Sequence, residues 1–162
     1  MTAAVKPIPE GYHTITPNLV CANAGAAIDF YKKAFGATEK GGRALSPDGK
    51  VAHAELRIGD SIIFLNDTMG PASALGSEPK IHPLQLHLYV ENADQVFDRA
   101  VAAGARVEMP LQNMFWGDRY GKVVDPYGHS WAIATHVEDV APQDMERRMK
   151  EFFTKAAAQG RA

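Results

Sequence analysis

The spacing of hydrophobic positions changes along the chain between an alternating and a helical period, which predicts short strands around a helix. Apolar residues recur at helical spacing over 26–35. Asn23 precedes them as a residue type that caps helix N-termini, and Gly36 follows them as a typical stop. β-branched and apolar stretches predict strands at 12–21, 38–45, 50–58 and 61–65.

The second half of the chain repeats this order of elements. A helical period over 93–103 ends at Gly104, and strands are predicted at 84–90, 106–111, 118–124 and 129–135. The Asn-Ala and Gly-Ala pairs that flank the first helix recur around the second, beginning at residues 23, 36, 92 and 104. This repeat predicts an α+β fold of two β-α-β-β-β modules lying edge to edge as a cupped mixed sheet, with helices on one face and a groove on the other.

The repeat also predicts the domain organisation. We expect a single domain over 12–137, made of module one (12–67), a linker rich in proline and glycine (68–83) and module two (84–137). Residues 1–11 are expected to form a flexible arm. In the tail, 138–162, apolar residues at helical spacing predict a helix that docks on apolar surface, with a dimer contact or a lid over the groove as the alternative.

Composition excludes several functional classes. The chain has 162 residues, of which 46% are hydrophobic, enough for a sizeable core. Its 17 Lys and Arg against 19 Asp and Glu give a formal net charge of −2, which argues against nucleic-acid binding. Cys21 is the single cysteine, so no disulfide forms within the chain, and no apolar run is long enough to span a membrane. Because the first ten residues lack the apolar core of a secretory signal, we expect a cytoplasmic protein.

Two segments within the repeat resemble a known family. The helix segment AIDFYKKAFGA at 27–37 and the DPYGH turn at 125–129 resemble the vicinal oxygen chelate superfamily, which includes glyoxalase I, extradiol dioxygenases and bleomycin-resistance proteins. LHLYVE at 86–91 and FWGDR at 115–119 look most similar to its PhnB-like branch. The resemblance implies the duplicated fold. It also implies a homodimer, because relatives commonly build their grooves with a second chain.

The resemblance also implies where a metal would be held. Metalloenzymes of the superfamily place their ligands on inward-facing strand positions, which correspond here to Thr16, Glu55, Gln85 and Ala132. Only Glu55 is a strong ligand for a divalent metal, whereas a catalytic site generally needs three good donors. We therefore expect no metal cofactor.

A different donor set keeps a metal site open as the alternative. Residues two apart on a strand share a face, so His53 joins Glu55 and His87 joins Gln85. If His53, Glu55 and His87 converge, they form a two-histidine, one-carboxylate set that suits Fe(II), Mn(II) or Zn(II).

The segment at 115–119 indicates a ligand instead. Trp116 can stack on a planar molecule, and Arg119 can pair with an anionic group. The bleomycin-resistance proteins, which bind drug without a metal, have a similar Trp-Gly-x-Arg stretch. The alternative interpretation is that Trp116 fills the core and that Arg119 pairs with Asp118 or Asp125.

These observations predict metal-independent binding of a small aromatic or amphipathic molecule, in the manner of an antibiotic-sequestering protein. The predicted contacts and polar floor are Trp116, Arg119, His53, Glu55, Gln85, His87 and Asn18. One alternative is a metal-dependent lyase, isomerase or dioxygenase acting on vicinal oxygens. Another is an interaction module without a ligand, which would use the tail helix.

Overall fold

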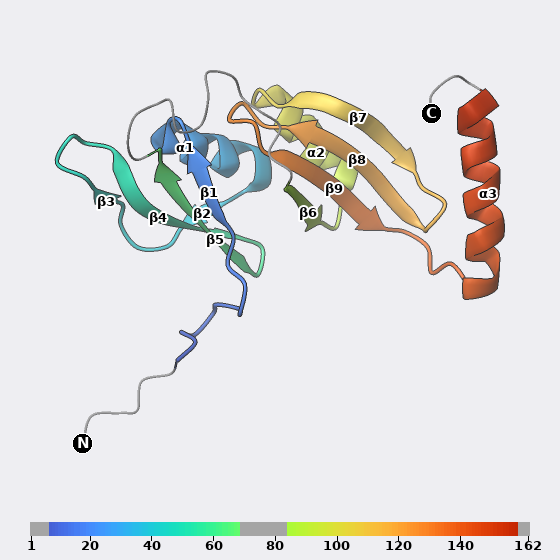
Figure 1. Ribbon diagram of the computed structural model, residues 1–162, viewed down its shortest axis with the longest axis horizontal. Coiled ribbons are helices and arrows are strands. Elements are labelled where there is room, and N and C mark those ends of the chain that lie inside the picture. Colours follow the sequence, from blue (N-terminus) through green and yellow to red (C-terminus); the bar gives the residue numbers. More distant parts are fainter. Residues whose placement is uncertain (1–6, 69–83, 159–162) are drawn as a thin grey trace.

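The computed structural model describes residues 7–68 and 84–158, which form two mixed sheets and three helices (Figure 1). The first module contains β1 (Asn18–Cys21), α1 (Ala24–Phe35), β2 (Thr38–Glu39), β3 (Ala44–Leu45), β4 (Val51–Ile58) and β5 (Ser61–Asp67). The second contains β6 (Gln85–Tyr89), α2 (Ala93–Ala102), β7 (Arg106–Asn113), β8 (Asp118–Val124) and β9 (Ser130–His136), and α3 (Pro142–Ala158) follows it. The predicted α+β fold with a duplicated module and a C-terminal helix is confirmed.

The two long helices of the modules are capped as their sequences predict. The side chain of Asn23 accepts the backbone N–H of Ala26 at 2.9 Å, and that of Asn92 accepts the N–H of Gln95 at 3.0 Å. Each bond satisfies an N–H group that has no partner inside its helix. Gly36 ends α1 with φ of 68°, a left-handed conformation that glycine adopts without strain.

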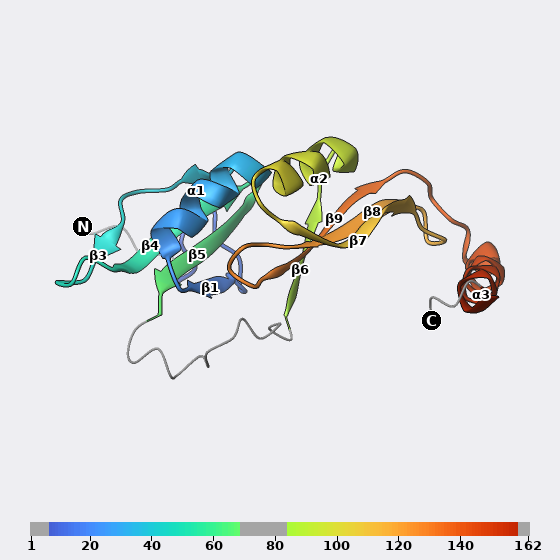
Figure 2. The same cartoon turned by 90° about the horizontal axis from the view of Figure 1, so that it is seen from above.

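Each sheet is covered by its own helix on one face. In the first sheet, ordered β1-β5-β4-β2, Leu19, Leu56 and Leu65 pack in the core beneath α1. In the second, ordered β6-β9-β8-β7, Trp131 and Ile133 of β9 belong to the same core. Figure 2 shows α1 and α2 on the same side of the two sheets. We call the opposite side of each sheet its open face.

The modules meet through their helices, and within the described residues no strand of one module pairs with a strand of the other. α1 packs against α2, and the rings of Phe35 and Trp131 lie 4.5 Å apart. The Tyr31 hydroxyl donates a hydrogen bond to Asp125 Oδ2 at 2.7 Å, from α1 to the turn after β8. Strand pairing among the described residues stays within each module, so β1 and β6 each lie at the edge of a sheet. Aromatic burial at the helix interface therefore takes the place of hydrogen bonding between strand edges.

Two predicted strands are shorter in the structure. The strand predicted at 12–21 is confined to β1, because Pro17 has no backbone N–H with which to extend the ladder. The strand predicted at 38–45 is divided into β2 and β3, since Gly41 turns the chain with φ of 74°.

The tail helix is confirmed as α3, which begins at Pro142. Of the predicted linker only Thr68, and of the predicted arm only residues 7–11, lie within the described part of the chain. Among the helices of the described residues, none has the length and apolar character needed to cross a membrane.

Candidate functional site

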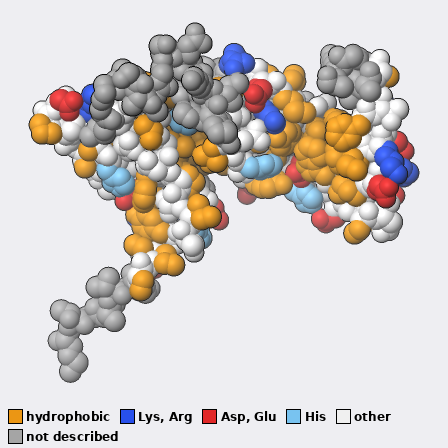
Figure 3. Space-filling view, viewed as in Figure 1, with side chains coloured by type: hydrophobic (Ala, Val, Ile, Leu, Met, Phe, Trp, Pro, Cys, Tyr) orange, Lys and Arg blue, Asp and Glu red, His pale blue; other side chains and the backbone are white. Residues whose placement is uncertain are grey.

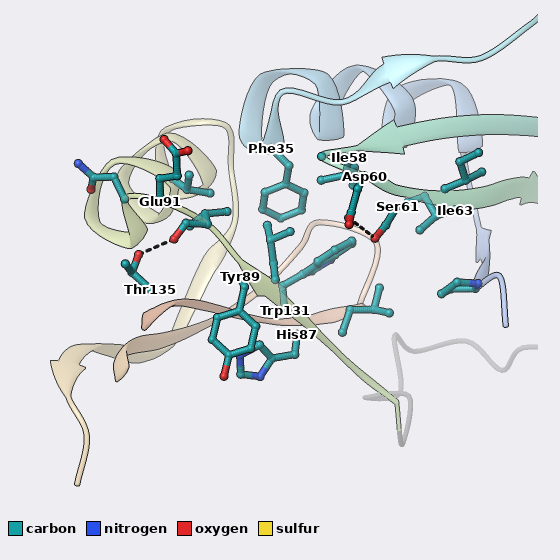
Figure 4. A pocket seen from close by; sticks show the side chains of 18 of the residues that line it. Phe35, Ile58, Asp60, Ser61, Ile63, His87, Tyr89, Glu91, Trp131 and Thr135 are labelled. Atoms are coloured by element: carbon teal, nitrogen blue, oxygen red, sulfur yellow. Dashed lines mark hydrogen bonds between the residues drawn. The ribbon is translucent and has the colours of Figure 1, made fainter. Parts of the chain in front are cut away.

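A cleft of about 1280 Å³ lies between the two modules. Figure 4 shows Ile58 and Ile63 on the side of module one, and His87 and Tyr89 from β6 on the side of module two. Trp131 lies between these walls. Apolar walls with a few polar groups are typical of small-molecule sites, and this cleft is large enough to hold such a ligand.

Four aromatic rings continue from the cleft across the open face of module two, and we call them the aromatic strip. The centroids of Tyr89 and His87 are 4.5 Å apart, and those of His87 and Tyr120 are 5.7 Å apart. Trp116 follows at 5.3 Å from Tyr120. His87 and Tyr89 share a face because they are two residues apart on β6, while Tyr120 comes from β8 and Trp116 from the hairpin before it. Tyr120 is buried, whereas His87 and Tyr89 are exposed, so a planar molecule can stack at the His87 and Tyr89 end of the strip.

A buried carboxylate fixes both ends of the strip. Asp118 is 2% exposed, and its Oδ2 accepts the Tyr89 hydroxyl at 3.0 Å and the Trp116 indole N–H at 2.8 Å. The Nδ1 of His136 lies 2.8 Å from the other carboxylate oxygen. Burial raises the pKa of Asp118, but the hydrogen bonds from His136, Trp116 and Tyr89 together hold it below its usual value. The carboxylate therefore stays ionised and orients two rings of the strip.

His136 connects this network to the chain segment that leads into α3. Its Nε2 lies 2.9 Å from Asp139 Oδ1, so the imidazole is held between two carboxylates. Hydrogen bonding to Asp139, and then to Asp118, raises the pKa of His136. Because His136 also lines the cleft, this arrangement favours a cationic imidazolium at its wall.

The strip rests on an apolar floor. Ala132 and Ala134 are fully buried on the open face of β9, where their small side chains leave room for the ring of Tyr120. Met114 joins the same cluster, and Phe152 of α3 packs against it. Figure 3 shows hydrophobic side chains gathered between the second sheet and α3. Phe152 of α3 therefore contacts the floor of the strip, whereas Met149 and Phe153 of the same helix are exposed.

A second, smaller pocket of about 480 Å³ lies on the open face of module one. Glu55 is at its wall, where it accepts the Tyr12 hydroxyl at Oε2. The Nε2 of His53 lies 3.3 Å from Oε1, and Lys40 Nζ lies 4.0 Å from Oε2. The hydrogen bond from Tyr12, followed by those from His53 and the charge of Lys40, lowers the pKa of Glu55 despite its partial burial.

The residues singled out from the sequence fall into three places. His87 and Trp116 lie together on the aromatic strip, and Gln85 at the start of β6 donates a hydrogen bond to Ser130 Oγ at 3.2 Å. On module one, His53 and Glu55 are in contact, while Asn18 donates to Asn66 Oδ1 at 2.8 Å on the neighbouring strand β5.

Arg119 is directed away from the strip. It pairs with Asp94 at the start of α2, with Nη2 2.6 Å from Oδ1. Asp118 and Asp125, the partners considered for it from the sequence, are held by other side chains. Arg119 and Trp116 belong to the same short segment of the sequence. Side chains along β8 alternate between the two faces of the sheet, however, and Arg119 lies on the face covered by α2.

Sequence reasoning missed Tyr89, Asp118, Tyr120 and His136. The period of two along β6 and β8 was a usable signal for the first three, since His87 and Tyr89 alternate together, as do Asp118 and Tyr120. The contact of Tyr12 with Glu55 joins residues 43 positions apart, and no local pattern indicates it.

The positions that correspond to metal ligands do not fit a bound metal. Ala132 has no donor atom and is fully buried, while Glu55 is engaged by Tyr12 and Lys40 and Gln85 by Ser130. In the alternative set, His53 and Glu55 are together, but His87 belongs to the strip on the other module. Within residues 7–68 and 84–158, no three His, Cys, Asp or Glu side chains gather as a metal site requires.

Known proteins share this fold. The chain is 42% identical over 144 residues to the uncharacterized protein Mb0911c of Mycobacterium bovis, which covers 83% of this chain and 91% of that protein. The crystal structure of TioX from Micromonospora sp. ML1 superposes with a TM-score of 0.62 at 28% identity, over 77% of this chain and 99% of TioX. A PhnB protein from Bacillus cereus, described as a putative 3-demethylubiquinone-9 3-methyltransferase, has the same fold, with a TM-score of 0.61 at 22% identity over 76% of this chain and 99% of its own.

The family model described as Glyoxalase/Bleomycin resistance protein/Dioxygenase superfamily matches residues 12–133, which span both modules. The duplicated β-α-β-β-β architecture and the two open faces agree with that match. This chain belongs to the glyoxalase/bleomycin resistance protein/dioxygenase superfamily.

Proposed function

We propose that the protein binds a small aromatic or amphipathic molecule on the aromatic strip, without a metal. The observation that carries this proposal is that one oxygen of a buried carboxylate, Asp118 Oδ2, accepts hydrogen bonds from both Tyr89 and Trp116 and so fixes two rings of the strip. Rings that are already fixed lose little conformational freedom when a ligand stacks on them, so more of the stacking energy appears as affinity.

The exposure of the strip supports the same proposal. Tyr89 is 61% exposed and His87 is also exposed, so a ligand on these rings would remove apolar surface from water. The cleft that begins at His87 and Tyr89 offers room for the rest of the molecule. Polar groups such as His136 at the wall would fix its orientation.

A second copy of the chain is part of the proposal. The homodimer expected from the resemblance is supported by the edge positions of β1 and β6 and by exposed Leu84 beside β6, at 55% exposure. Sedimentation velocity should give twice the mass of the chain, and a monomer at micromolar concentration would contradict a stable dimer.

Tryptophan fluorescence tests the ligand site. We expect 8-anilinonaphthalene-1-sulfonate, or members of a panel of planar aromatic antibiotics, to quench Trp116 emission saturably. Tyr89→Ala should weaken the affinity about tenfold, which corresponds to about 1.4 kcal/mol, because a fixed stacking partner is lost. Trp116→Phe should remove the part of the quenching that comes from the strip, and any quenching that remains comes from Trp131 at the cleft. Arg119→Ala is the matched control and should leave the affinity unchanged.

Other outcomes would contradict the proposal. They are a panel without saturable binding, or equal losses in Tyr89→Ala and Arg119→Ala. Elemental analysis of protein purified without chelator or added metal adds an independent readout. Near-stoichiometric iron, manganese, nickel or zinc that is lost in Glu55→Gln would support a metal-dependent lyase, isomerase or dioxygenase instead.

A further inference from the structure

An ammonium group of the chain itself, that of Lys40, lies against two residues that line the small pocket on module one, Tyr12 and Glu55. Lys40 Nζ lies 3.8 Å from the centroid of the Tyr12 ring and 4.0 Å from Glu55 Oε2. The ring face and the carboxylate both attract a cation, and both lie within 4.0 Å of the same nitrogen.

The groups around this ammonium are held in place by one another. Tyr12 donates its hydroxyl to Glu55, so the ring and the carboxylate cannot move independently. The ring of Phe64 packs against Tyr12 with centroids 6.0 Å apart and against His53 at 4.9 Å. A carboxylate fixed among aromatic rings is the chemistry that recognises an organic cation.

From this geometry we infer that the Glu55 pocket is a binding site for an organic ammonium compound with an apolar body, and that Lys40 competes with the ligand for it. The site is separate from the aromatic strip and does not depend on the function proposed there. At the position where metalloenzymes of the superfamily have a metal-binding carboxylate, this chain would use the carboxylate for an amine.

The surroundings of the pocket determine both the class of ligand and its competitor. Pro7, Ile8 and Pro9 line the pocket beyond the carboxylate, which provides apolar surface for the body of the ligand. The Lys40 side chain is 37% exposed, while its backbone N–H is anchored to the Glu55 carbonyl at 2.9 Å. The flexible side chain can therefore leave the carboxylate without moving the strand.

Binding of phenethylamine, followed by ¹H–¹⁵N NMR shifts at Tyr12 and Phe64, tests the inference. Lys40→Met should tighten the binding about three- to tenfold, because it removes the competing cation and leaves the charge of Glu55 uncompensated. Lys50→Met is the matched control: it changes the net charge equally, but Lys50 pairs with exposed Asp48 on a distant turn and should have no effect. Glu55→Gln should remove the saturable shifts.

A gain of affinity in Lys40→Met cannot arise from misfolding, so the test remains informative even if Glu55→Gln is unstable. Neutral 2-phenylethanol and anionic phenylacetate separate a cation site from a merely apolar one, and both should bind at least tenfold more weakly than the amine. Equal effects of Lys40→Met and Lys50→Met would overturn the inference. So would binding of 2-phenylethanol as tight as that of phenethylamine. Substitution of Trp116 should leave these shifts unchanged, so the two sites can fail separately.

Discussion

Asp118 and Asp125 are both buried, and each is kept ionised by its hydrogen bonds. Burial raises the pKa of each carboxyl, but donors on neighbouring side chains lower it further than burial raises it. Cys21 has no such donors: burial, with smaller effects from Asp125 and Asp67, raises its pKa to about 12. The thiol is therefore un-ionised at neutral pH, so it is a poor nucleophile.

At the scale of single residues, the two carboxylates around His136 predict how its pKa responds to substitution. Asp139→Asn should lower the pKa of His136, and Asp118→Asn should lower it less, because the hydrogen bond to Asp139 is the larger cause of the raised value. Titration of the imidazole proton signals by NMR measures both changes. An unchanged pKa in Asp139→Asn would contradict the arrangement of His136 between two carboxylates.

The raised pKa also gives a pH dependence to stability. Since the folded value lies above the unfolded value of about 6.5, His136 stabilises the folded chain below that pH, and its contribution is lost as pH rises through the folded pKa. His136→Gln should therefore lower the midpoint of urea unfolding at about pH 6 and have less effect at about pH 9. Equal effects at both pH values would argue against a charged histidine.

At the scale of elements, α2 lies against β8 with no room between them. A Cβ added at Gly121 would be 2.8 Å from Phe97 Cε2 and 3.1 Å from the backbone of Leu111. The close packing of α2 on β8 therefore requires a residue without a side chain at position 121. In α1, by contrast, a Cβ at Gly25 would meet neighbouring atoms no closer than 3.5 Å.

These two glycines make an opposed pair of predictions. Gly121→Ala should lower the free energy of unfolding by about 1–3 kcal/mol, because α2 must move outward. Gly25→Ala should raise it by up to about 1 kcal/mol, because alanine is the better helix former and fits without a clash. Urea unfolding monitored by circular dichroism measures both. A stabilised Gly121→Ala would show that the contact between α2 and β8 is looser than the structure places it.

At the scale of the whole molecule, one turn connects the modules. Asp125 accepts the Tyr31 hydroxyl from module one at 2.7 Å and the Trp131 indole from module two at 2.9 Å. The orientation of the two open faces, and of the cleft between them, therefore depends on a buried contact between residues 94 positions apart.

Tyr31→Phe tests this connection. Loss of the hydroxyl leaves a buried carboxylate with fewer donors, and the free energy of unfolding should fall by about 1–3 kcal/mol. Tyr127→Phe is the control, since the Tyr127 ring packs against Phe30 but its hydroxyl makes no hydrogen bond in the described part of the chain. Urea unfolding of both variants measures the difference, and equal losses would contradict the role of the hydroxyl.

The sequence by itself determined the elements and their duplication, since caps such as Asn23 and Asn92 and the alternation along each strand depend on residues close in the chain. The sequence also showed that position 132 offers no metal donor, because an alanine side chain has no donor atom in any fold. Relations over distance were beyond its reach: the modules meet through their helices, and Arg119 finds its partner on α2.

Only the tertiary structure decided which side chains share a site. The aromatic strip combines β6, β8 and a hairpin, and the Glu55 pocket combines the arm, β4 and β5, with Lys40 beside Glu55. Such groupings follow from strand register and from the packing of α1 on α2, which are set by the summed burial of many residues. A short stretch of sequence does not reveal the combined burial of residues far apart in the chain. The partners of Asp118 and Glu55 could therefore be identified only from the folded structure.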